Sequence, residues 1–269
     1  MDEFRDKVAV VTGAASGIGF GLARRFASDG MKVVMADVEE PALKSAADEL
    51  ESDGAEVLPV VTDVSDHDAV QALAAATFDR FGTAHIVCNN AGIGTGGPTW
   101  TVTEAQWRWI IGVNLMGVVH GIQAFVPRFI EQGEGHVVNT ASAAGLLSGP
   151  GMSPYFATKH AVVALSESLA ADLAMAGADV GVSVLCPGFV RTRIQESDRN
   201  RPADVVAFEE QSPDLEARRE FMNAAIAGGM DPAEVAEHVV AAIRAKKLHI
   251  FTHPEMITAI RQRFTTILD

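Results

Sequence analysis

A tyrosine and a lysine four residues apart suggest proton-transfer chemistry. Tyr155 and Lys159 lie in an Ala-rich stretch of helical character, and this spacing places both side chains on one face of a helix. An unperturbed phenol has a pKa of about 10, which is too high for a useful base near neutral pH. A neighbouring ammonium favours the phenolate, so we expect Lys159 to lower the pKa of Tyr155 and make it an acid/base.

Two more polar residues are candidates for the same site. Ser142 follows a predicted strand and could hydrogen-bond a substrate oxygen that Tyr155 also contacts. Asn114 lies within an apolar helical stretch, where a buried amide needs partners and could hold a water molecule. Because Tyr-x-x-x-Lys occurs by chance in many helices, the interpretation depends on all four residues occurring together.

A glycine-rich segment near the start of the chain predicts a phosphate-binding turn. Three glycines lie between a predicted strand and a predicted helix, which is the context that a dinucleotide site requires. Glycine lets the backbone approach a pyrophosphate, and the N-terminus of the helix offers free N–H groups to the anion. Glycine is common in turns of every kind, so the prediction depends on the position of these glycines between a strand and a helix. The expected contacts are Thr12, Gly13, Ser16, Gly17, Ile18 and Gly19.

Asp37 ends the second predicted strand and predicts the type of dinucleotide. An acid at this place accepts hydrogen bonds from the adenosine ribose and repels a 2′-phosphate. The neighbouring residues 14–16 and Val38 supply no cation to neutralise such a phosphate, so NAD is favoured over NADP. A solvated aspartate in a turn is the common alternative, but this one coincides with the glycine-rich segment.

Turns after the third and fourth predicted strands offer further cofactor contacts. Asp63 and Val64 could contact the adenine, and Asn90, Ala91 and Gly92 could line the nicotinamide-ribose side. Either turn taken alone is equally consistent with ordinary turn chemistry.

The elements that must position these residues alternate regularly. Short β-branched runs predict strands at 8–11, 32–36, 57–61, 84–88, 136–139 and 180–186, with helices at 18–28, 41–52, 66–81, within 104–132 and at 154–175. This alternation predicts an α/β fold with a doubly wound parallel sheet of Rossmann type, whose ligands lie beyond the carboxyl ends of the strands. We expect a single domain over 1–269, with a helical substrate lid at about 191–230 and a helix–strand–helix at 231–269.

Composition excludes several other functions. The 269 residues carry 21 basic and 35 acidic side chains, a net charge of −14, which disfavours nucleic-acid and membrane-surface binding. Two cysteines in apolar runs indicate buried side chains in a reducing compartment. The charged N-terminus leaves no room for a signal peptide, and we expect no run of about 20 apolar residues that could span a membrane. The expected location is the cytoplasm.

Two groups of charged or metal-binding residue types have less specific interpretations. Arginines at 191, 193, 199 and 201 alternate with acids, which favours a salt-bridged surface or a subunit contact over an anion site. His249 and His253 have no ligand pattern around them, so no metal is expected.

Apolar residues near the catalytic set could form a substrate wall or simply the core: Leu146, Leu147, Met152 and Phe189, with Phe208, Phe221 and Met222 in the lid.

Taken together, these residues resemble the short-chain dehydrogenase/reductase family of compact NAD(P) oxidoreductases. The matching motifs span residues 8–192 and are Thr12-Gly13-x-x-x-Gly17-x-Gly19, Asp63, Asn89-Asn90-Ala91-Gly92, Asn114, Ser142, Tyr155-x-x-x-Lys159 and Pro187-Gly188-x-x-x-Thr192. The resemblance implies that Tyr155 is the acid/base, Ser142 polarises the substrate oxygen, and Lys159 binds the nicotinamide ribose. It also implies a relay water at Asn114, a carboxamide contact from Thr192, and cofactor contacts from Pro187, Gly188 and Val190.

The tail departs from the commonest family pattern, a glycine-rich Asp-Gly-Gly segment. Residues 193–202 and 252–254 instead resemble bacterial dehydrogenases of bulky aryl or alicyclic secondary alcohols, including the lignin aryl-ether Cα-dehydrogenases. The expected function is NAD-dependent hydride transfer with such an alcohol or ketone as the small-molecule substrate. The alternatives are an NADPH-dependent ketoreductase of steroid or polyketide type and a non-catalytic dinucleotide-binding protein. The family also implies that helices at 104–132 and 154–176 pair between subunits, in a homodimer or homotetramer.

Overall fold

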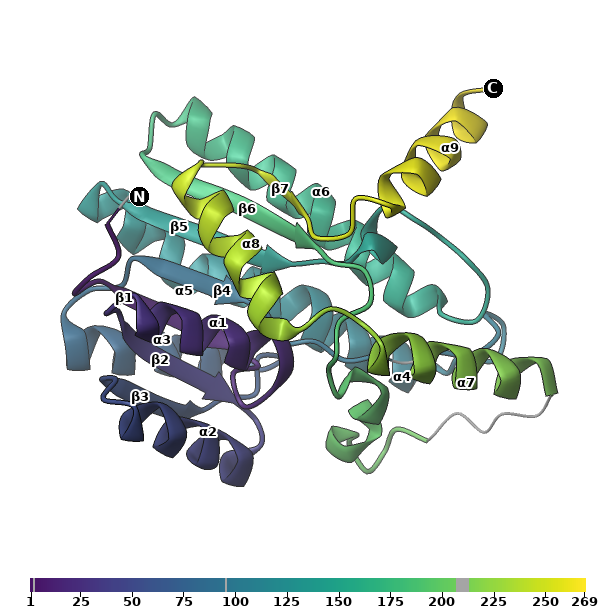
Figure 1. The fold of residues 1–269 in the computed structure, drawn as a ribbon, viewed down its shortest axis with the longest axis horizontal. Helices are drawn as coiled ribbons and strands as arrows, with labels where there is room; N and C mark the ends of the chain where they lie inside the picture. The colour runs from purple at the N-terminus through teal and green to yellow at the C-terminus, as the bar shows by residue number, and fades with distance from the viewer. Residues whose placement is uncertain (2, 95, 207–212) are drawn as a thin grey trace.

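A seven-stranded parallel sheet forms the centre of the molecule (Figure 1). This computed structural model describes residues 1–269 except 2, 95 and 207–212. The strand order is β3-β2-β1-β4-β5-β6-β7. The strands are β1 (Val8–Thr12), β2 (Lys32–Asp37), β3 (Val57–Val61), β4 (Ile86–Asn89), β5 (Gly135–Thr140), β6 (Val180–Cys186) and β7 (His249–Phe251).

Helices cover both faces of this sheet, which confirms the doubly wound architecture. Alternate strand residues bury against two separate helix layers, as the two-residue period of a strand requires. One layer contains α1 (Gly17–Ser28), α2 (Glu40–Ser52) and α8 (Pro232–Arg244). The other contains α3 (His67–Phe81), α5 (Gly117–Gln132) and α6 (Ser153–Met175). The predicted strands and helices therefore occur where the sequence pattern places them, within a few residues.

The strand order reverses between β1 and β4, and this reversal locates the site. From β1 the chain proceeds outward to β2 and β3, then returns to pair β4 beside β1. The connections leaving β1 and β4 therefore run in opposite directions and open a crevice at the carboxyl ends of these strands. Thr12 ends β1 and Asn89 ends β4, so both predicted turns reach this crevice.

The long apolar helix predicted within 104–132 is interrupted by a π-helical turn. It consists of α4 (Glu104–Ile111), the π turn η1 (Gly112–Met116) and α5. By length and composition this stretch, Glu104–Gln132, could cross a membrane, which the sequence analysis did not expect. Half of its most apolar window is buried inside the protein, where α5 packs on α3 and on β5. Such packing is typical of a core helix, which satisfies the same two criteria.

The chain after β6 forms the predicted lid region and the tail. A 3-10 segment, η3 (Ile194–Asn200), is followed by α7 (Pro213–Ala227), and Phe208 lies outside the described residues. The tail continues through α8 and β7 to α9 (Met256–Leu268), as predicted. Figure 1 shows α9 projecting from the body of the molecule, and Ile260 is its buried residue.

Candidate active site

A cavity of about 850 Å³ lies beyond the carboxyl ends of the strands and brings most of the predicted site residues together. Three predicted residues, Thr12, Gly19 and Asn114, stand behind its wall rather than on it. The predicted residues that line the cavity are Gly13, Ser16, Gly17, Ile18, Asp37, Asp63, Val64, Asn90, Ala91, Gly92, Ser142, Tyr155, Lys159, Pro187, Gly188, Val190 and Thr192.

Thr12 and Gly19 shape the turn that holds the glycine-rich segment. The Thr12 Oγ1 accepts hydrogen bonds from the backbone N–H groups of Asn90 (2.9 Å) and Ala91 (3.0 Å), which joins the end of β1 to the turn after β4. A Cβ on Gly19 would lie 2.1 Å from the Gly13 carbonyl oxygen, so the first turn of α1 packs against the loop only because residue 19 is glycine. The N-terminus of α1 therefore opens directly into the cavity.

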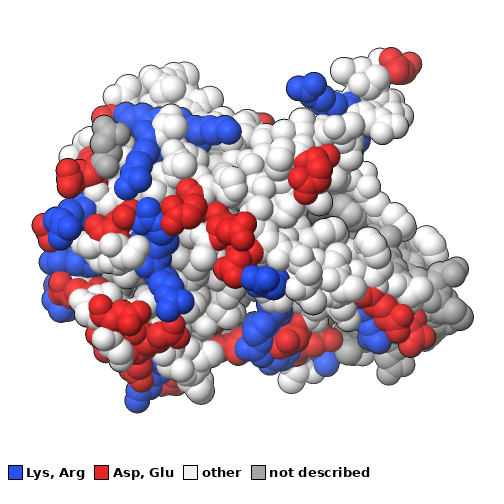
Figure 2. Space-filling view, viewed as in Figure 1, with Lys and Arg blue, Asp and Glu red and all other residues white. Residues whose placement is uncertain are grey.

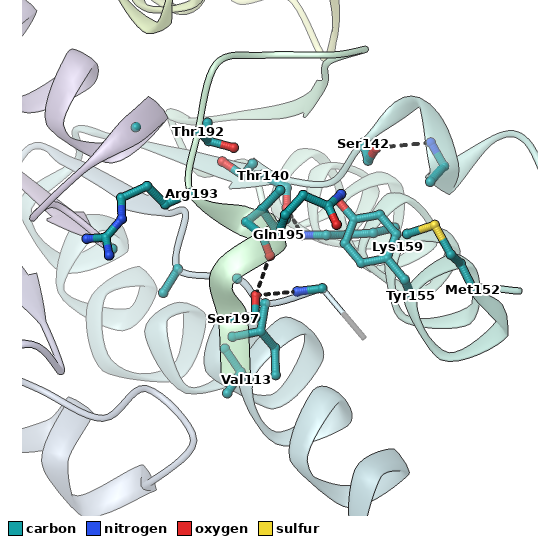
Figure 3. A pocket seen from close by; sticks show the side chains of 18 of the residues that line it. Val113, Thr140, Ser142, Met152, Tyr155, Lys159, Thr192, Arg193, Gln195 and Ser197 are labelled. Carbon is teal, nitrogen blue, oxygen red and sulfur yellow. Dashed lines mark hydrogen bonds between the residues drawn. The ribbon is translucent and has the colours of Figure 1, made fainter. Parts of the chain in front are cut away.

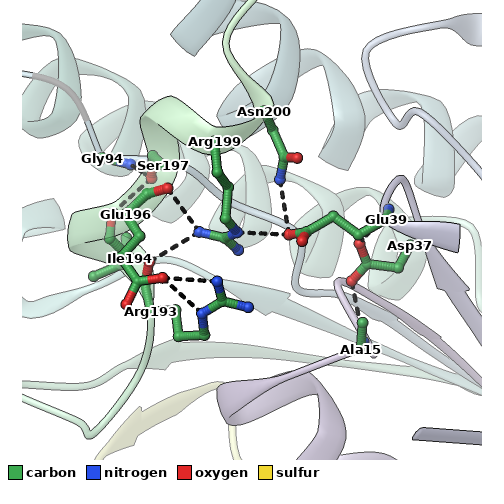
Figure 4. A network of polar contacts seen from close by, with 10 residues as sticks. All are labelled: Ala15, Asp37, Glu39, Gly94, Arg193, Ile194, Glu196, Ser197, Arg199 and Asn200. Atoms are coloured by element: carbon green, nitrogen blue, oxygen red, sulfur yellow. Dashed lines mark hydrogen bonds and ion pairs between the residues drawn. The ribbon is translucent and has the colours of Figure 1, made fainter. Parts of the chain in front are cut away.

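Asp37 lies at the end of the cavity formed by β2 and the glycine-rich turn (Figure 4). Its carboxylate accepts a hydrogen bond from the N–H of Ala15 (3.0 Å) and another from the N–H of Glu39 (3.0 Å). The first bond ties β2 to the glycine-rich turn. Asp37 thus has a structural contact as well as the position expected of a ribose-binding acid.

Glu39 joins this end of the cavity to the lid segment. Its Oε1 accepts hydrogen bonds from Arg199 Nε (2.6 Å) and Asn200 Nδ2 (2.9 Å), both on η3. Burial opposes the charge on Glu39, but the hydrogen bonds from Asn200 and Arg199 outweigh it and lower the pKa of this carboxyl. Nothing in the sequence indicated this contact, because Glu39 and Arg199 are 160 residues apart along the chain.

Residues 14–16 and Val38 supply no cation beside Asp37, but a distant part of the chain brings two arginines to the same end of the cavity. The lid folds back over the end of β2 and brings Arg193 and Arg199 to the same cavity wall. Both guanidinium groups are already paired, Arg193 with Glu196 and Arg199 with Glu39 (Figure 4). The predicted salt-bridged surface is confirmed, since the remaining two arginines of this cluster also form ion pairs: Arg191 with Asp231 and Arg201 with Asp198.

Tyr155 and Lys159 share one face of α6 at the other end of the cavity (Figure 3). The Lys159 Nζ lies 5.7 Å from the centroid of the Tyr155 ring. It donates a hydrogen bond to the carbonyl oxygen of Thr140 (2.8 Å), at the end of β5. The sequence could not indicate this partner, because a backbone oxygen is independent of residue type. Lys159 is buried, so this bond fixes the direction of its ammonium.

Burial shifts both of these groups away from their charged forms. It raises the pKa of Tyr155 above its usual value, against a hydrogen bond with Ser142 that lowers it. Burial also lowers the pKa of Lys159 to about 8, although a smaller charge interaction with Cys186 raises it. The expected lowering of the Tyr155 pKa is therefore wrong for the protein alone, because desolvation outweighs the hydrogen bond with Ser142.

Ser142 begins the short 3-10 turn η2 (Ala143–Gly145) and lines the cavity. Its Oγ accepts a hydrogen bond from the N–H of Ala144 (3.1 Å) and lies 3.5 Å from the carbonyl oxygen of Pro187. The hydroxyl is also hydrogen-bonded to Tyr155, so it lies where it can hold a substrate oxygen next to the phenol.

Asn114 lies in the π turn η1 and is fully buried. Its Oδ1 accepts from the N–H of Ile93 (2.8 Å), and its Nδ2 donates to the carbonyl of Ile93 (3.0 Å). A longer contact joins Nδ2 to the Thr158 hydroxyl (3.4 Å). The buried amide therefore has the partners that it needs, and it holds the segment after β4 against α6. A π turn inside a helix frequently marks a functional position.

Apolar side chains line the side of the cavity next to Tyr155. Of the four residues considered for a substrate wall, Leu147, Met152 and Phe189 line the cavity, whereas Leu146 packs with the core. In α7, Met222 lines the cavity and Phe221 is exposed. Four further apolar residues of this wall carry no signal in the sequence: Trp109, Val113, Phe156 and Ile226. The same holds for Gln195, whose side chain extends toward the Tyr155 ring (Figure 3).

The described part of the chain contains no cluster of three His, Cys, Asp or Glu residues that could hold a metal. His249 pairs with Glu167, and His253 contacts the N–H of Gly188. Cys88 and Cys186 are free and buried, as predicted. Burial raises the pKa of both thiols, so neither is poised to ionise.

Comparison with known proteins identifies the family. The sequence profile described as short chain dehydrogenase matches residues 7–203, which include the cofactor turn and the Tyr155–Lys159 pair. The chain belongs to the short-chain dehydrogenase family. It is therefore an oxidoreductase of that family, and the matched region includes most of the residues that line the cavity.

Relatives of this short-chain dehydrogenase align over nearly its whole length. It is 36% identical to a CLA biosynthesis dehydrogenase/reductase of Lactiplantibacillus plantarum, covering 100% of this chain and 95% of the relative. It is 35% identical to a C alpha-dehydrogenase of a Sphingobium species, over 100% and 88%. A short-chain dehydrogenase/reductase of Burkholderia phymatum, solved in complex with NAD, shares 45% identity and a TM-score of 0.96, over 99% and 96%.

Proposed function

We propose that this short-chain dehydrogenase transfers a hydride between NAD and a hydrophobic secondary alcohol or ketone of aryl or alicyclic type. The observation that carries the proposal is the convergence of Tyr155, Lys159 and Ser142 on one cavity that is glycine-lined at its other end. The Tyr155 phenol lies between the glycine-lined part of the cavity and the part with apolar walls. It can therefore exchange a proton with a substrate hydroxyl while a bound dinucleotide lies in the glycine-lined part.

Each side chain has a distinct part in the proposed reaction. In alcohol oxidation the Tyr155 oxygen takes the hydroxyl proton, and Ser142 holds the same substrate oxygen. Lys159 supplies positive charge beside the phenol, held in direction by the Thr140 carbonyl. Asn114 holds the backbone next to the site and stands behind it on the proposed proton path. The nicotinamide, when bound, supplies the hydride acceptor.

The fit of the cavity to a dinucleotide rests on its glycine turn. A Cβ on Gly13 would lie 2.9 Å from the Cα of Ala91, and one on Gly17 would lie 3.0 Å from the Thr192 side chain. Side chains at these two positions would fill the crevice in front of α1. Their absence leaves the N–H groups at the start of that helix open to an anion.

The preference for NAD is part of the proposal and rests on two carboxylates. Asp37 and Glu39 line the end of the cavity where β2 stops, and the pKa of Glu39 is lowered, so it is ionised at neutral pH. Arg199 and Arg193 on the same wall are held in ion pairs with Glu39 and Glu196, so the charge of Asp37 remains to repel a 2′-phosphate. The similar Burkholderia phymatum structure, which holds NAD, also supports this choice.

The substrate class is supported by the wall beside Tyr155. Aromatic and aliphatic side chains dominate that part of the cavity, and apolar lining favours burial of an apolar substrate. The C alpha-dehydrogenase relative supports an aryl alcohol in particular. The free buried cysteines are consistent with a reducing compartment, so we place the proposed activity in the cytoplasm.

The test is the variant Tyr155→Phe with a panel of aryl and alicyclic secondary alcohols, followed by NADH absorbance. Removing the phenolic oxygen should lower kcat by at least about 100-fold, as expected for loss of a general acid/base. NADH binding, measured by fluorescence, should stay within about twofold, because the ring is retained. Near-normal turnover in the variant, or no turnover of any alcohol or ketone by the wild type, would overturn the proposal.

A further inference from the structure

A histidine in the C-terminal tail touches the turn that lines the cofactor cavity. The N–H of Gly188 donates a hydrogen bond to His253 Nδ1 (3.0 Å), and Gly188 itself lines the cavity. His253 lies 50 residues beyond the end of the family match at residue 203. Its contact therefore belongs to the part of the chain whose role the family does not define.

The pairing of two strands sets this contact. Cys186, the last residue of β6, pairs with Phe251, the last residue of β7, in parallel register. Two residues further along each strand, Gly188 and His253 come face to face. The register of the two strands therefore places the imidazole of His253 next to the N–H of Gly188.

The turn is clamped from both sides. A Cβ on Gly188 would lie 2.7 Å from the His253 Cγ, so the backbone sits directly against the ring. On the opposite side, the carbonyl oxygen of Pro187 accepts a hydrogen bond from the N–H of Ala143 (2.8 Å), the residue after Ser142. The Pro187 carbonyl and the Gly188 N–H belong to one peptide group, so the Ser142 segment and His253 hold this group from its two sides.

The hydrogen bond from the Gly188 N–H fixes the tautomer of the His253 imidazole. A backbone N–H can only donate, so His253 Nδ1 must carry a lone pair and the ring proton must lie on Nε2. The buried Thr252 hydroxyl lies 2.7 Å from the same nitrogen and can donate to it as well. Two donors thus converge on one acceptor, which orients the ring.

We propose that His253 is a positioning residue that fixes the Pro187–Gly188 turn for nicotinamide dinucleotide binding. The inference rests on the proposed function, since it assumes that the cavity takes such a dinucleotide. Without the acceptor, the Gly188 N–H loses its partner and the turn is free to move away from the cavity. The dinucleotide must then order the turn when it binds, which weakens its affinity.

Three variants at position 253 test whether the hydrogen-bond acceptor Nδ1, rather than the size of the imidazole ring, holds the turn. His253→Asn carries its amide oxygen on Cγ, as the imidazole carries Nδ1, so it retains the acceptor. His253→Gln carries its oxygen one bond further out, and His253→Leu carries none. We expect the Kd for NADH, measured by fluorescence titration, to rise about fivefold to tenfold in the Gln and Leu variants, as for loss of one hydrogen bond. The Asn variant should stay within about twofold of the wild type.

A matched control comes from the same strand. His249→Leu removes an imidazole from β7 whose Nε2 contacts Glu167 on α6, away from the Pro187–Gly188 turn, and should leave the Kd unchanged. Unchanged affinity in both the Gln and Leu variants, or an Asn variant as weak as these two, would overturn the positioning role. A wild type that binds no nicotinamide dinucleotide would instead overturn the proposed function itself. Because binding is measured without a substrate, the two failures are distinguishable.

Discussion

At the scale of single residues, burial holds the proposed acid/base, Tyr155, in its neutral form. Burial raises the pKa of Tyr155 and lowers the pKa of Lys159, so the protein alone favours the neutral phenol. A cation bound next to the phenol would favour the phenolate instead. We infer that the phenolate forms only after the oxidised dinucleotide has entered, which couples proton transfer to cofactor binding.

The single tyrosine makes this inference measurable. The chain contains 13 Phe, 3 Trp and one Tyr, so the ultraviolet signal of tyrosinate reports Tyr155 alone. In the free protein we expect this signal to appear at a pH above the ordinary value of about 10, because burial raises the pKa. Saturating NAD⁺ should move the titration to lower pH. Tyr155→Phe provides the blank, and a midpoint unaffected by NAD⁺ would contradict the coupling.

Asp37 supplies a second prediction at this scale. Asp37→Asn keeps an oxygen that can accept the Ala15 N–H but removes the negative charge. The ratio of kcat/KM for NAD over NADP should fall by about tenfold or more, because the repulsion of a 2′-phosphate is reduced. Adding Glu39→Gln should lower the ratio further, since Arg199 then loses its carboxylate partner. A wild type that already prefers NADP would contradict the assignment.

The types and spacing of residues predicted the candidate catalytic set but not its electrostatics. Tyr155, Lys159 and Ser142 share one cavity because a helical spacing and a strand end fix where their backbones lie. The direction of the Tyr155 pKa shift depends on how tightly the surrounding chain packs, and the spacing of residues in the sequence does not reveal this packing. Glu39 was missed for a similar reason, because its importance comes from partners on η3.

At the scale of elements, η3 bridges the two sides of the cofactor cavity. Ser197 Oγ accepts a hydrogen bond from the N–H of Gly94 (2.8 Å), after β4. Arg199 contacts Glu39, after β2, and its Nη1 donates to the carbonyls of Arg193 (3.0 Å) and Glu196 (2.9 Å). The segment is thus fastened to both walls of the cavity, so we expect it to retain a bound dinucleotide.

Loosening this bridge should accelerate cofactor release. Arg199→Ala removes the half-buried ion pair with Glu39 and two hydrogen bonds to carbonyls. We expect the dissociation rate of NADH, followed by stopped-flow fluorescence, to rise about tenfold, as for a charge-assisted contact worth about 1.5 kcal/mol. Arg108→Ala is the control, because its pair with Glu104 is exposed on α4. An unchanged rate in Arg199→Ala would show that η3 does not retain the cofactor.

The sequence predicted elements better than their contacts. Alternation of β-branched and Ala-rich runs is a local property, so the strands and helices from β1 to β6 were located from it. The π turn η1 was not, because it arises where Asn114 turns inward to bond Ile93. The bridge from η3 to Glu39 likewise joins segments that no local pattern connects.

At the scale of the whole molecule, charge is distributed over the surface in both signs. Figure 2 shows acidic and basic side chains interleaved on the part of this face formed by α1 and α2, with a largely uncharged surface toward α9. The net charge of −14 is therefore not concentrated in one acidic patch on this face. Mixed charge keeps long-range attraction to polyanions weak, in agreement with the proposed small-molecule substrate.

The outer face of α6 supports the proposal that the protein is a homodimer or homotetramer. Apolar residues occur on the exposed side of α6 as well as on its buried side, together with Glu167 and Asp172 on the exposed side. Its exposed face carries small residues spaced at helical intervals, namely Ala157, Ala164, Ser168 and Ala171. Small side chains let the backbones of two helices approach closely, so this face can pack on the same face of a second copy, with α5 beside it.

Ala164→Arg should separate the subunits of such an assembly. Two arginines facing each other across a close helix pair would clash and repel, whereas one arginine on an exposed helix face is tolerated in a single chain. By light scattering we expect a mass for the wild type that is two or four times 28.4 kDa, and a smaller multiple for the variant. Ala241→Arg is the matched control, because Ala241 is an exposed alanine on α8 in the opposite helix layer. A wild type of 28.4 kDa, or dissociation by both variants alike, would contradict the proposed interface.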